Sequence, residues 1–89
     1  MNTNNIKIKE AFDSLFEELQ SLCDDNHILL RYYYNTELNS YNLRFEKCNK
    51  AFRYSISETD LIYKRKAIIL SEINSKLIEL YDSIRNSIH

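Results

Sequence analysis

The chain has 89 residues and a formal net charge of −1, and hydrophobic residues make up 44% of it. This length is that of one domain, and hydrophobic residues spread along the whole chain exclude a disordered protein. Glycine and proline are both absent. The glycine-rich phosphate loop, the Rossmann turn and the nucleophile elbow are therefore excluded, because each needs glycine at fixed positions.

Neither a signal peptide nor a membrane span is expected. The N-terminal stretch "MNTNNIKIKEAF" has no apolar core of the kind that secretory signals contain. No segment approaches the ~18 consecutive apolar residues of a membrane helix. We therefore expect a cytoplasmic protein in which Cys23 and Cys48 are reduced thiols.

The first segment predicts an amphipathic helix that ends at or before Asp24 and Asp25, since carboxylates are unfavourable at the negative end of a helix dipole. Asn4 or Asn5 is expected to cap its start. Its apolar residues recur at steps of three and four, at Ile8, Phe12, Leu15, Leu19 and Leu22.

Residues 28–57 alternate large apolar and polar residues with period two, which predicts strands. The first strand covers 28–35, and "NTELNS" has the composition of a turn. A second turn at Cys48-Asn49 makes residues 41–56 a hairpin, in which three apolar pairs share one side. These pairs are Phe45 with Phe52, Leu43 with Tyr54, and Tyr41 with Ile56. The expected buried residues are Leu30, Tyr32, Leu43, Phe45, Tyr54 and Ile56.

"SETD" at residues 57–60 is a capping box, in which Ser57 caps a helix and Asp60 reaches back. The apolar stripe after it predicts one long helix that continues nearly to the C-terminus. Steps of three and four from Leu70 to Ile84 resemble a coiled-coil seam. Because the end of this helix extends past the other elements, we expect a homodimer through Leu77, Leu80, Tyr81, Ile84 and Ile88.

The resulting fold class is α+β: a helix, a three-stranded antiparallel meander and a long helix, with both helices on one sheet face. Single-sequence patterns leave an all-helical bundle as the alternative fold. No repeat or linker divides residues 1–89, so they form a single domain.

No catalytic or metal site emerges from the residue types and spacings. The only histidines are His27 and His89, and no serine or cysteine has a base implied by its spacing. Cys23 and His27 are four residues apart, but two ligands do not make a metal site. We therefore expect neither enzymatic activity nor a cofactor, with Cys23 as a buried thiol and His27 in a loop.

Charge is distributed unevenly. Residues 1–25 hold two lysines against six acidic residues, whereas residues 26–57 hold five basic residues against two acidic ones. A second basic run, Lys64-Arg65-Lys66, is expected in the first turns of the last helix. Pairing with Glu58 and Asp60 is the simplest role for this run.

The order of the elements is similar to that of the double-stranded RNA-binding domain, whose last helix contacts RNA through an early basic cluster. This resemblance implies an RNA- or DNA-binding regulator that uses Lys47, Lys50, Lys64, Arg65 and Lys66. The glycines, the proline-histidine loop and the alanine-rich last helix of that family have no counterpart here. The resemblance is therefore one of topology, which does not imply function.

The outward sheet face is the other candidate surface. Arg44 and Arg53 are neighbours across the hairpin, where they repel unless an anion is near. Arginine and tyrosine are enriched in interface hot spots. These residues predict a partner-binding site at Arg31, Tyr33, Arg44 and Arg53, although a merely solvated face explains the same pattern.

The function expected from these observations is that of a small non-catalytic factor that inhibits or modulates a larger protein. Small glycine-free chains without catalytic residues are typical of phages and mobile elements, which encode inhibitors of host machinery, anti-CRISPR proteins among them. A nucleic-acid-binding regulator and a structural homodimer are the alternatives. No membrane partner is expected.

Overall fold

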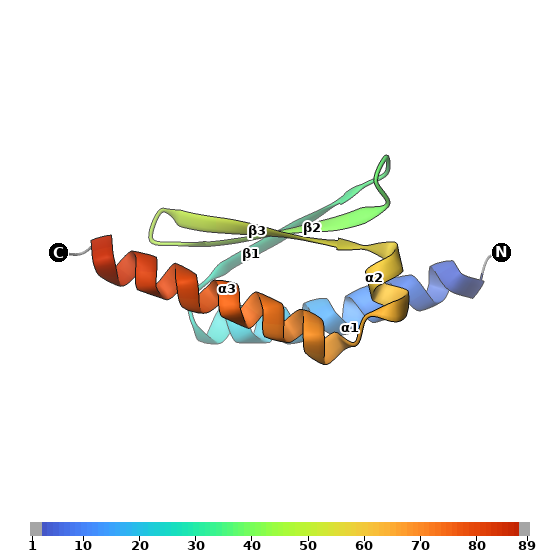
Figure 1. Ribbon diagram of the computed structural model, residues 1–89, viewed down its shortest axis with the longest axis horizontal. Helices are drawn as coiled ribbons and strands as arrows, with labels where there is room; N and C mark the ends of the chain where they lie inside the picture. The colour runs from blue at the N-terminus through green and yellow to red at the C-terminus, as the bar shows by residue number, and fades with distance from the viewer. Residues whose placement is uncertain (1–2, 88–89) are drawn as a thin grey trace.

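The fold is a three-stranded sheet covered on one face by helices (Figure 1). The computed structural model describes residues 3–87. In chain order the elements are α1 (Thr3–Asp25), β1 (Leu29–Asn35), β2 (Ser40–Lys47), β3 (Lys50–Ser57), α2 (Glu58–Tyr63) and α3 (Lys66–Ser87). The strands pair antiparallel in the order β1-β2-β3. The predicted α+β fold is confirmed, and the all-helical alternative is wrong.

The second hairpin has the predicted register. Phe45 pairs with Phe52, Leu43 with Tyr54 and Tyr41 with Ile56. Cys48 and Asn49 form its two-residue turn, with φ angles of 52° and 65°. Positive φ at both positions is the type I′ geometry, whose twist matches that of the flanking strands. The apolar pairing thus imposes this turn even though neither residue is glycine.

Two asparagines shape the loop of the first hairpin, between β1 and β2. The Asn35 side-chain oxygen accepts hydrogen bonds from the backbone N–H groups of Glu37 (2.9 Å) and Leu38 (3.1 Å). Asn39 takes a left-handed φ of 48° just before β2, a conformation that asparagine tolerates better than most residues. The side chain and backbone of asparagine therefore close a loop that contains no glycine.

One hydrophobic core fills the space between the sheet and the helices. Its buried members come from every element except α2: Phe12, Leu15, Leu19 and Cys23 of α1, Leu30, Leu43, Phe45 and Ile56 of the sheet, Ile69, Ile73, Leu77 and Leu80 of α3, and Ile28 before β1. Tyr54 is only partly buried. The prediction for Tyr32 is wrong, because this side chain is 49% exposed. It does face α1, with its ring 4.9 Å from those of Phe12 and Phe16, but β1 is an edge strand and leaves one flank of the ring in solvent.

The end of α1 is a Schellman motif. His27 has a left-handed φ of 56°, and its N–H donates to the Asp24 carbonyl (3.3 Å) while that of Ile28 donates to Cys23 (2.8 Å). Both Cys23 and Ile28 are buried, as the hydrophobic contact of this motif requires. The predicted end of the helix is confirmed. The predicted cap at Asn4 or Asn5 is wrong, because α1 already begins at Thr3.

The last helical segment is divided, contrary to prediction. The capping box is confirmed: Ser57 Oγ accepts from the Asp60 N–H (3.0 Å), and Asp60 accepts from the Ser57 N–H (3.3 Å). The helix it starts ends at Tyr63, because Lys64 is extended, with φ −91° and ψ 134°. A second helix, α3, begins at Lys66 and runs at an angle to α2 (Figure 1). Neither glycine nor proline marks this break.

Within residues 3–87, no helix is both long and apolar enough to cross a membrane. The described part of the chain is elongated, measuring 54 × 25 × 19 Å along its principal axes. Its length follows α1 and α3, while the sheet and the helix layer are stacked across it (Figure 1).

Candidate binding face

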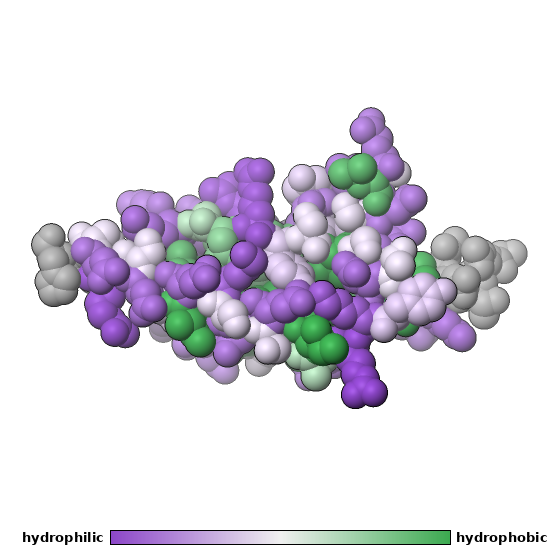
Figure 2. Space-filling view, in the orientation of Figure 1, coloured by the Kyte–Doolittle hydropathy of each residue, from purple (hydrophilic) through white to green (hydrophobic). Residues whose placement is uncertain are grey.

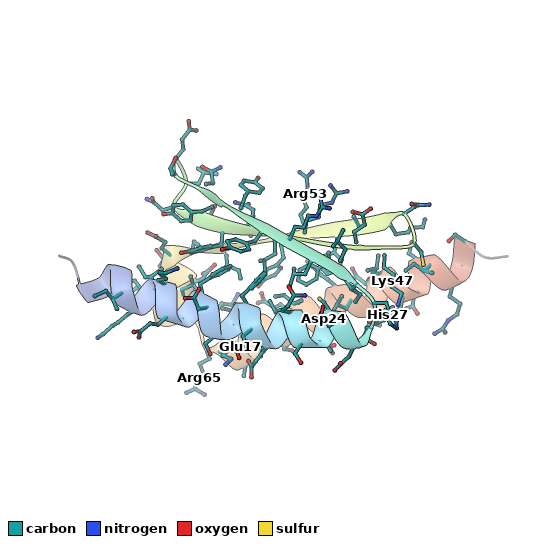
Figure 3. All side chains as sticks on the ribbon, turned by 180° about the vertical axis from the view of Figure 1, so that it is seen from behind. Glu17, Asp24, His27, Lys47, Arg53 and Arg65 are labelled. Atoms are coloured by element: carbon teal, nitrogen blue, oxygen red, sulfur yellow. The ribbon has the colours of Figure 1, made fainter. Side chains whose placement is uncertain are left out.

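No helix of residues 3–87 covers the sheet face opposite α1 and α3 (Figure 3). We call it the open face and define it by the alternate residues of the three strands: Leu29, Arg31, Tyr33, Asn42, Arg44, Glu46, Ala51, Arg53 and Ser55. Asn42 and Glu46 are half-buried, and all the others are exposed. Figure 3 shows Arg53 pointing away from the helix layer. The predicted outward orientation of Arg31, Tyr33, Arg44 and Arg53 is therefore confirmed.

Three arginines stand in one row across the open face. Arg31 pairs with Arg44, and Arg44 pairs with Arg53. Adjacent strands lie ~4.8 Å apart, so the three Cα atoms span about 10 Å. Within residues 3–87, Arg44 is the one member with an ion pair, at 3.8 Å from Glu46. We call these residues the arginine row, and the open face around it carries a positive charge.

Two polar side chains beside the arginine row are hydrogen-bonded to each other. Tyr33, Asn42 and Ser55 form the neighbouring row. Ser55 Oγ donates to Asn42 Oδ1 at 2.6 Å, and Asn42 Nδ2 contacts Ser40 Oγ at 3.3 Å. The Tyr33 side chain is 59% exposed. The arginines, Tyr33 and Asn42 border a shallow hollow, which offers an anionic group charged donors on one side and an aromatic ring on the other.

The lysines proposed for nucleic-acid binding contact other parts of the chain. Lys47 projects to the helix side of the sheet, where its ammonium group donates to the Asn26 carbonyl and lies 5.7 Å from the centre of the Tyr81 ring. It therefore ties β2 to the end of α1 and to α3. Lys50 pairs with Lys47 across the hairpin, is half-buried and borders Glu79 and Asp82 of α3. Neither lysine belongs to the open face.

The basic run after α2 also makes contacts other than those predicted. Lys64 pairs with Glu72 at 2.8 Å, and Lys66 pairs with Glu18 at 2.8 Å. The expected pairing with Glu58 and Asp60 is wrong: Lys64 and Arg65 form the break between α2 and α3, and Lys66 is the first residue of α3. Arg65 is exposed and points away from the sheet, on the opposite side of the molecule from Arg53 (Figure 3).

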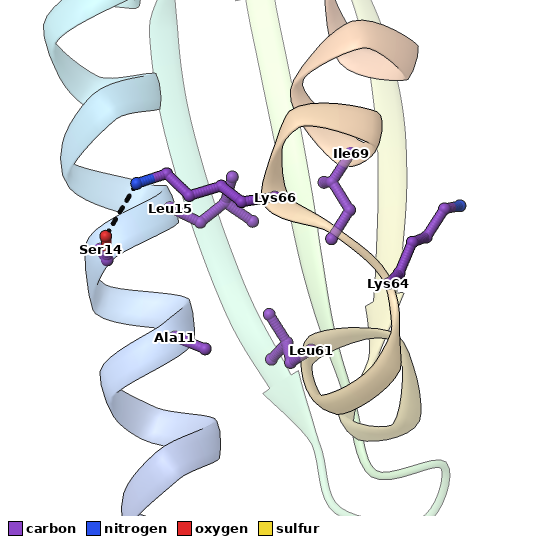
Figure 4. A pocket seen from close by; sticks show the side chains of 7 residues that line it. All are labelled: Ala11, Ser14, Leu15, Leu61, Lys64, Lys66 and Ile69. Atoms are coloured by element: carbon purple, nitrogen blue, oxygen red, sulfur yellow. Dashed lines mark hydrogen bonds between the residues drawn. The ribbon is translucent and has the colours of Figure 1, made fainter.

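A small cavity lies where α1, α2 and α3 meet (Figure 4). Ala11, Leu15, Leu61 and Ile69 form its apolar walls. Lys66 spans its mouth, with its ammonium group 2.9 Å from Ser14 Oγ. Since both lysines at this cavity are neutralised by glutamates, it lacks a free charge to hold an anionic ligand.

The residues predicted for dimerisation belong largely to the core of the single chain. Leu77 and Leu80 are buried, and Tyr81 and Ile84 pack half-buried against the same core. Ile88 lies outside the described residues. The expectation that the end of α3 lacks intrachain cover is therefore wrong for Tyr81 and Ile84. Figure 2 shows this side of the molecule as mostly hydrophilic, with small and separate hydrophobic patches.

Cys23 and His27 do not converge on a metal site. The Cys23 side chain is fully buried, and burial raises the pKa of its thiol to about 11, which disfavours the thiolate that metals bind. His27 is exposed. Within residues 3–87, no group of three or more histidine, cysteine, aspartate or glutamate side chains is arranged to hold a metal ion.

Comparison with known proteins adds no family to this description. No protein-family model, no curated protein and no solved structure matches the chain. The function has to be inferred from the residues and their geometry.

Proposed function

We propose that this protein is a small non-catalytic binding factor that inhibits or modulates a larger partner protein, and that the arginine row contacts an acidic patch on that partner. The observation that carries this proposal is the position of Arg31, Arg44 and Arg53 side by side on an uncovered face. Like charges directly opposite in a sheet are destabilising. A partner carboxylate would offset this cost and add charge-assisted hydrogen bonds to the guanidinium groups.

An acidic protein suits this face better than a nucleic acid. The whole chain carries a net charge of −1, so the positive charge of the open face is local. Phosphate backbones are usually bound by basic side chains spread over a long path. Here Lys47, Lys64 and Lys66 are held by contacts inside the chain. A compact row about 10 Å wide matches a few clustered carboxylates. An inhibitor encoded by a phage or mobile element would be one such factor.

The test compares two double variants of equal charge change. Arg44→Ala with Arg53→Ala removes two members of the arginine row. Arg65→Ala with Lys76→Ala removes two exposed basic residues away from the sheet. Partners are captured from a nuclease-treated host lysate, and affinities are then measured with the purified captured protein. The row variant should weaken binding by about thirtyfold, equivalent to about 2 kcal/mol, and the control variant should bind as the parent does.

Fold integrity and nucleic acid are tested in parallel. The row variant should match or slightly exceed the parent in thermal stability, because it removes a like-charge pair. Binding to short single-stranded and duplex RNA probes is measured at two salt concentrations. Tight, salt-dependent RNA binding that the row variant abolishes, with no protein captured after nuclease treatment, would replace the proposed function with nucleic-acid binding.

A further inference from the structure

The outer edge of β1 is an unpaired sheet edge. β1 pairs only with β2 within residues 3–87, and none of its residues makes a backbone hydrogen bond elsewhere. Its sequence, LLRYYYN, contains no proline, lysine or glycine. Natural edge strands usually carry charged residues, above all lysine, or proline or a bulge that prevents pairing with another chain, and here Arg31 is the one charged residue of the strand. In Figure 3 this edge faces the viewer, and no helix passes in front of it.

The second hairpin determines which residues of β1 turn their backbone N–H and C=O groups toward the free edge. Residues that flank a two-residue type I′ turn form a hydrogen-bonded pair, here Lys47 and Lys50. Hydrogen-bonded and non-bonded pairs alternate along an antiparallel ladder. The β2 residues that are not bonded to β3 are therefore bonded to β1, and the register identifies their partners as Leu29, Arg31, Tyr33 and Asn35. Leu30, Tyr32 and Tyr34 consequently direct their N–H and C=O groups toward the free edge. These groups are available to another strand.

Aromatic side chains are exposed along the same edge. Tyr32, Tyr33 and Tyr34 are 49%, 59% and 37% exposed, although they lie within a strand. Tyr33 belongs to the open face, while Tyr32 and Tyr34 project to the helix side. Both faces next to the edge therefore keep apolar ring surface in solvent. A strand added at this edge would cover ring surface on each side.

We propose that β1 pairs antiparallel with β1 of a second copy of this chain, joining the two sheets into one continuous six-stranded sheet. The pairing that overlaps all of Leu29–Asn35 has its twofold axis at Tyr32. It matches Leu30 with Tyr34 of the partner subunit, both residues with outward backbone groups. In this full-overlap register, each residue whose backbone groups point to the free edge lies opposite another such residue, as a self-complementary interface requires.

Charge favours the same register. In the full-overlap pairing, Arg31 lies opposite Tyr33 of the partner subunit, so the guanidinium group can contact an aromatic ring. A shift of the register by two residues would still match the residues whose backbone groups point outward. In one direction, however, it would place Arg31 opposite Arg31 of the partner subunit, which is repulsive. The second copy is therefore the occupant that this edge fits. The dimer would join two arginine rows on one face, but it does not depend on the proposed function.

Sedimentation equilibrium of the purified protein, from low to high micromolar concentration, tests the dimer. Tyr33→Lys should raise the dimer dissociation constant at least tenfold, because it sets a lysine against Arg31 of the partner subunit on both sides of the axis. Tyr33→Glu should lower it by creating two ion pairs. Tyr33 is exposed and outside the core, so both variants should keep the circular dichroism spectrum of the parent.

The matched controls are Ser55→Lys and Ser55→Glu, which make the same changes in the same row but on β3. The dimer dissociation constant of both Ser55 variants should stay within about twofold of the parent value. A monomer at high micromolar concentration overturns the proposal. So does a dimer that responds equally to the Tyr33 and Ser55 variants, or to neither. Partner capture by the Arg44 and Arg53 variant is a separate readout, so the two proposals can fail independently.

Discussion

Glu72 of α3 contacts Tyr54 of the sheet and Lys64 of the break between α2 and α3. Its carboxylate accepts a hydrogen bond from the Tyr54 hydroxyl and pairs with the Lys64 ammonium group at 2.8 Å. The hydrogen bond from Lys64, followed by that from Tyr54, lowers the pKa of Glu72. Burial, together with the hydrogen bond to Glu72, raises the pKa of Tyr54. The carboxylate therefore stays charged and the phenol neutral across the neutral range.

This contact predicts a pH-dependent contribution to stability. A carboxyl group whose pKa is lower in the folded chain stabilises it above its unfolded pKa, and this contribution disappears as pH falls through the folded pKa. At pH 7 the Glu72→Gln variant should therefore unfold at a lower urea concentration than the parent. The difference between the two unfolding midpoints should narrow below about pH 4. Lys64→Met should reproduce this behaviour from the other side of the pair. A gap that stays constant with pH would mean that Glu72 acts through uncharged contacts.

The end of α1 depends on one residue in an unusual backbone conformation. His27 has the left-handed conformation that closes α1, a position where glycine is the usual residue. His27→Gly should raise the free energy of unfolding by about 0.5–1 kcal/mol, because relief of the left-handed strain exceeds the added backbone entropy of glycine. His27→Val should lower it, since β-branched residues are strained there. Urea denaturation measures both variants.

The opposite result for His27→Gly would be informative. A loss of stability would show that the imidazole contributes a contact beyond its backbone role. His27 is exposed, so the backbone role is the one that the structure supports.

The whole molecule buries one face of each long helix against one sheet. α3 directs Ile73, Leu77 and Leu80 into the core shared with α1. A seam with coiled-coil spacing thus serves the packing of a single chain. A sheet needs cover on at least one face. Here the apolar stripes of both α1 and α3 pack against the same face of the sheet.

This packing predicts that Leu77→Ala affects stability more than association. Leu77 is 2% exposed, so the substitution should cost about 2–5 kcal/mol through lost burial and the cavity left behind. The cost should not vary with protein concentration, because the contacts lie within one chain. Ile78→Ala, at an exposed neighbour, is the control and should change stability by less than about 1 kcal/mol. Equal small costs would mean that α3 packs against another chain.

The sequence by itself determined the elements that depend on neighbours along the chain. The period-two pattern and the three apolar pairs of residues 41–56 were enough to predict the second hairpin and its register, since a shift by one residue would move every apolar side chain to the wrong face. The Ser57 capping box and the end of α1 were also predictable, because capping and dipole effects act within a single turn. The orientation of Arg31, Tyr33, Arg44 and Arg53 followed from the same alternation.

Only the tertiary structure decided how distant residues combine. Lys64 and Lys66 pair with Glu72 and Glu18, and the break between α2 and α3 carries no glycine or proline to announce it. The coiled-coil spacing of α3 could not tell an intrachain core from a dimer seam, because both need the same apolar stripe. The addition of Arg31 to the row, and the free edge of β1, depend on which strands are neighbours. Sequence periodicity describes which face a residue occupies, whereas the packing of whole elements decides what lies opposite it.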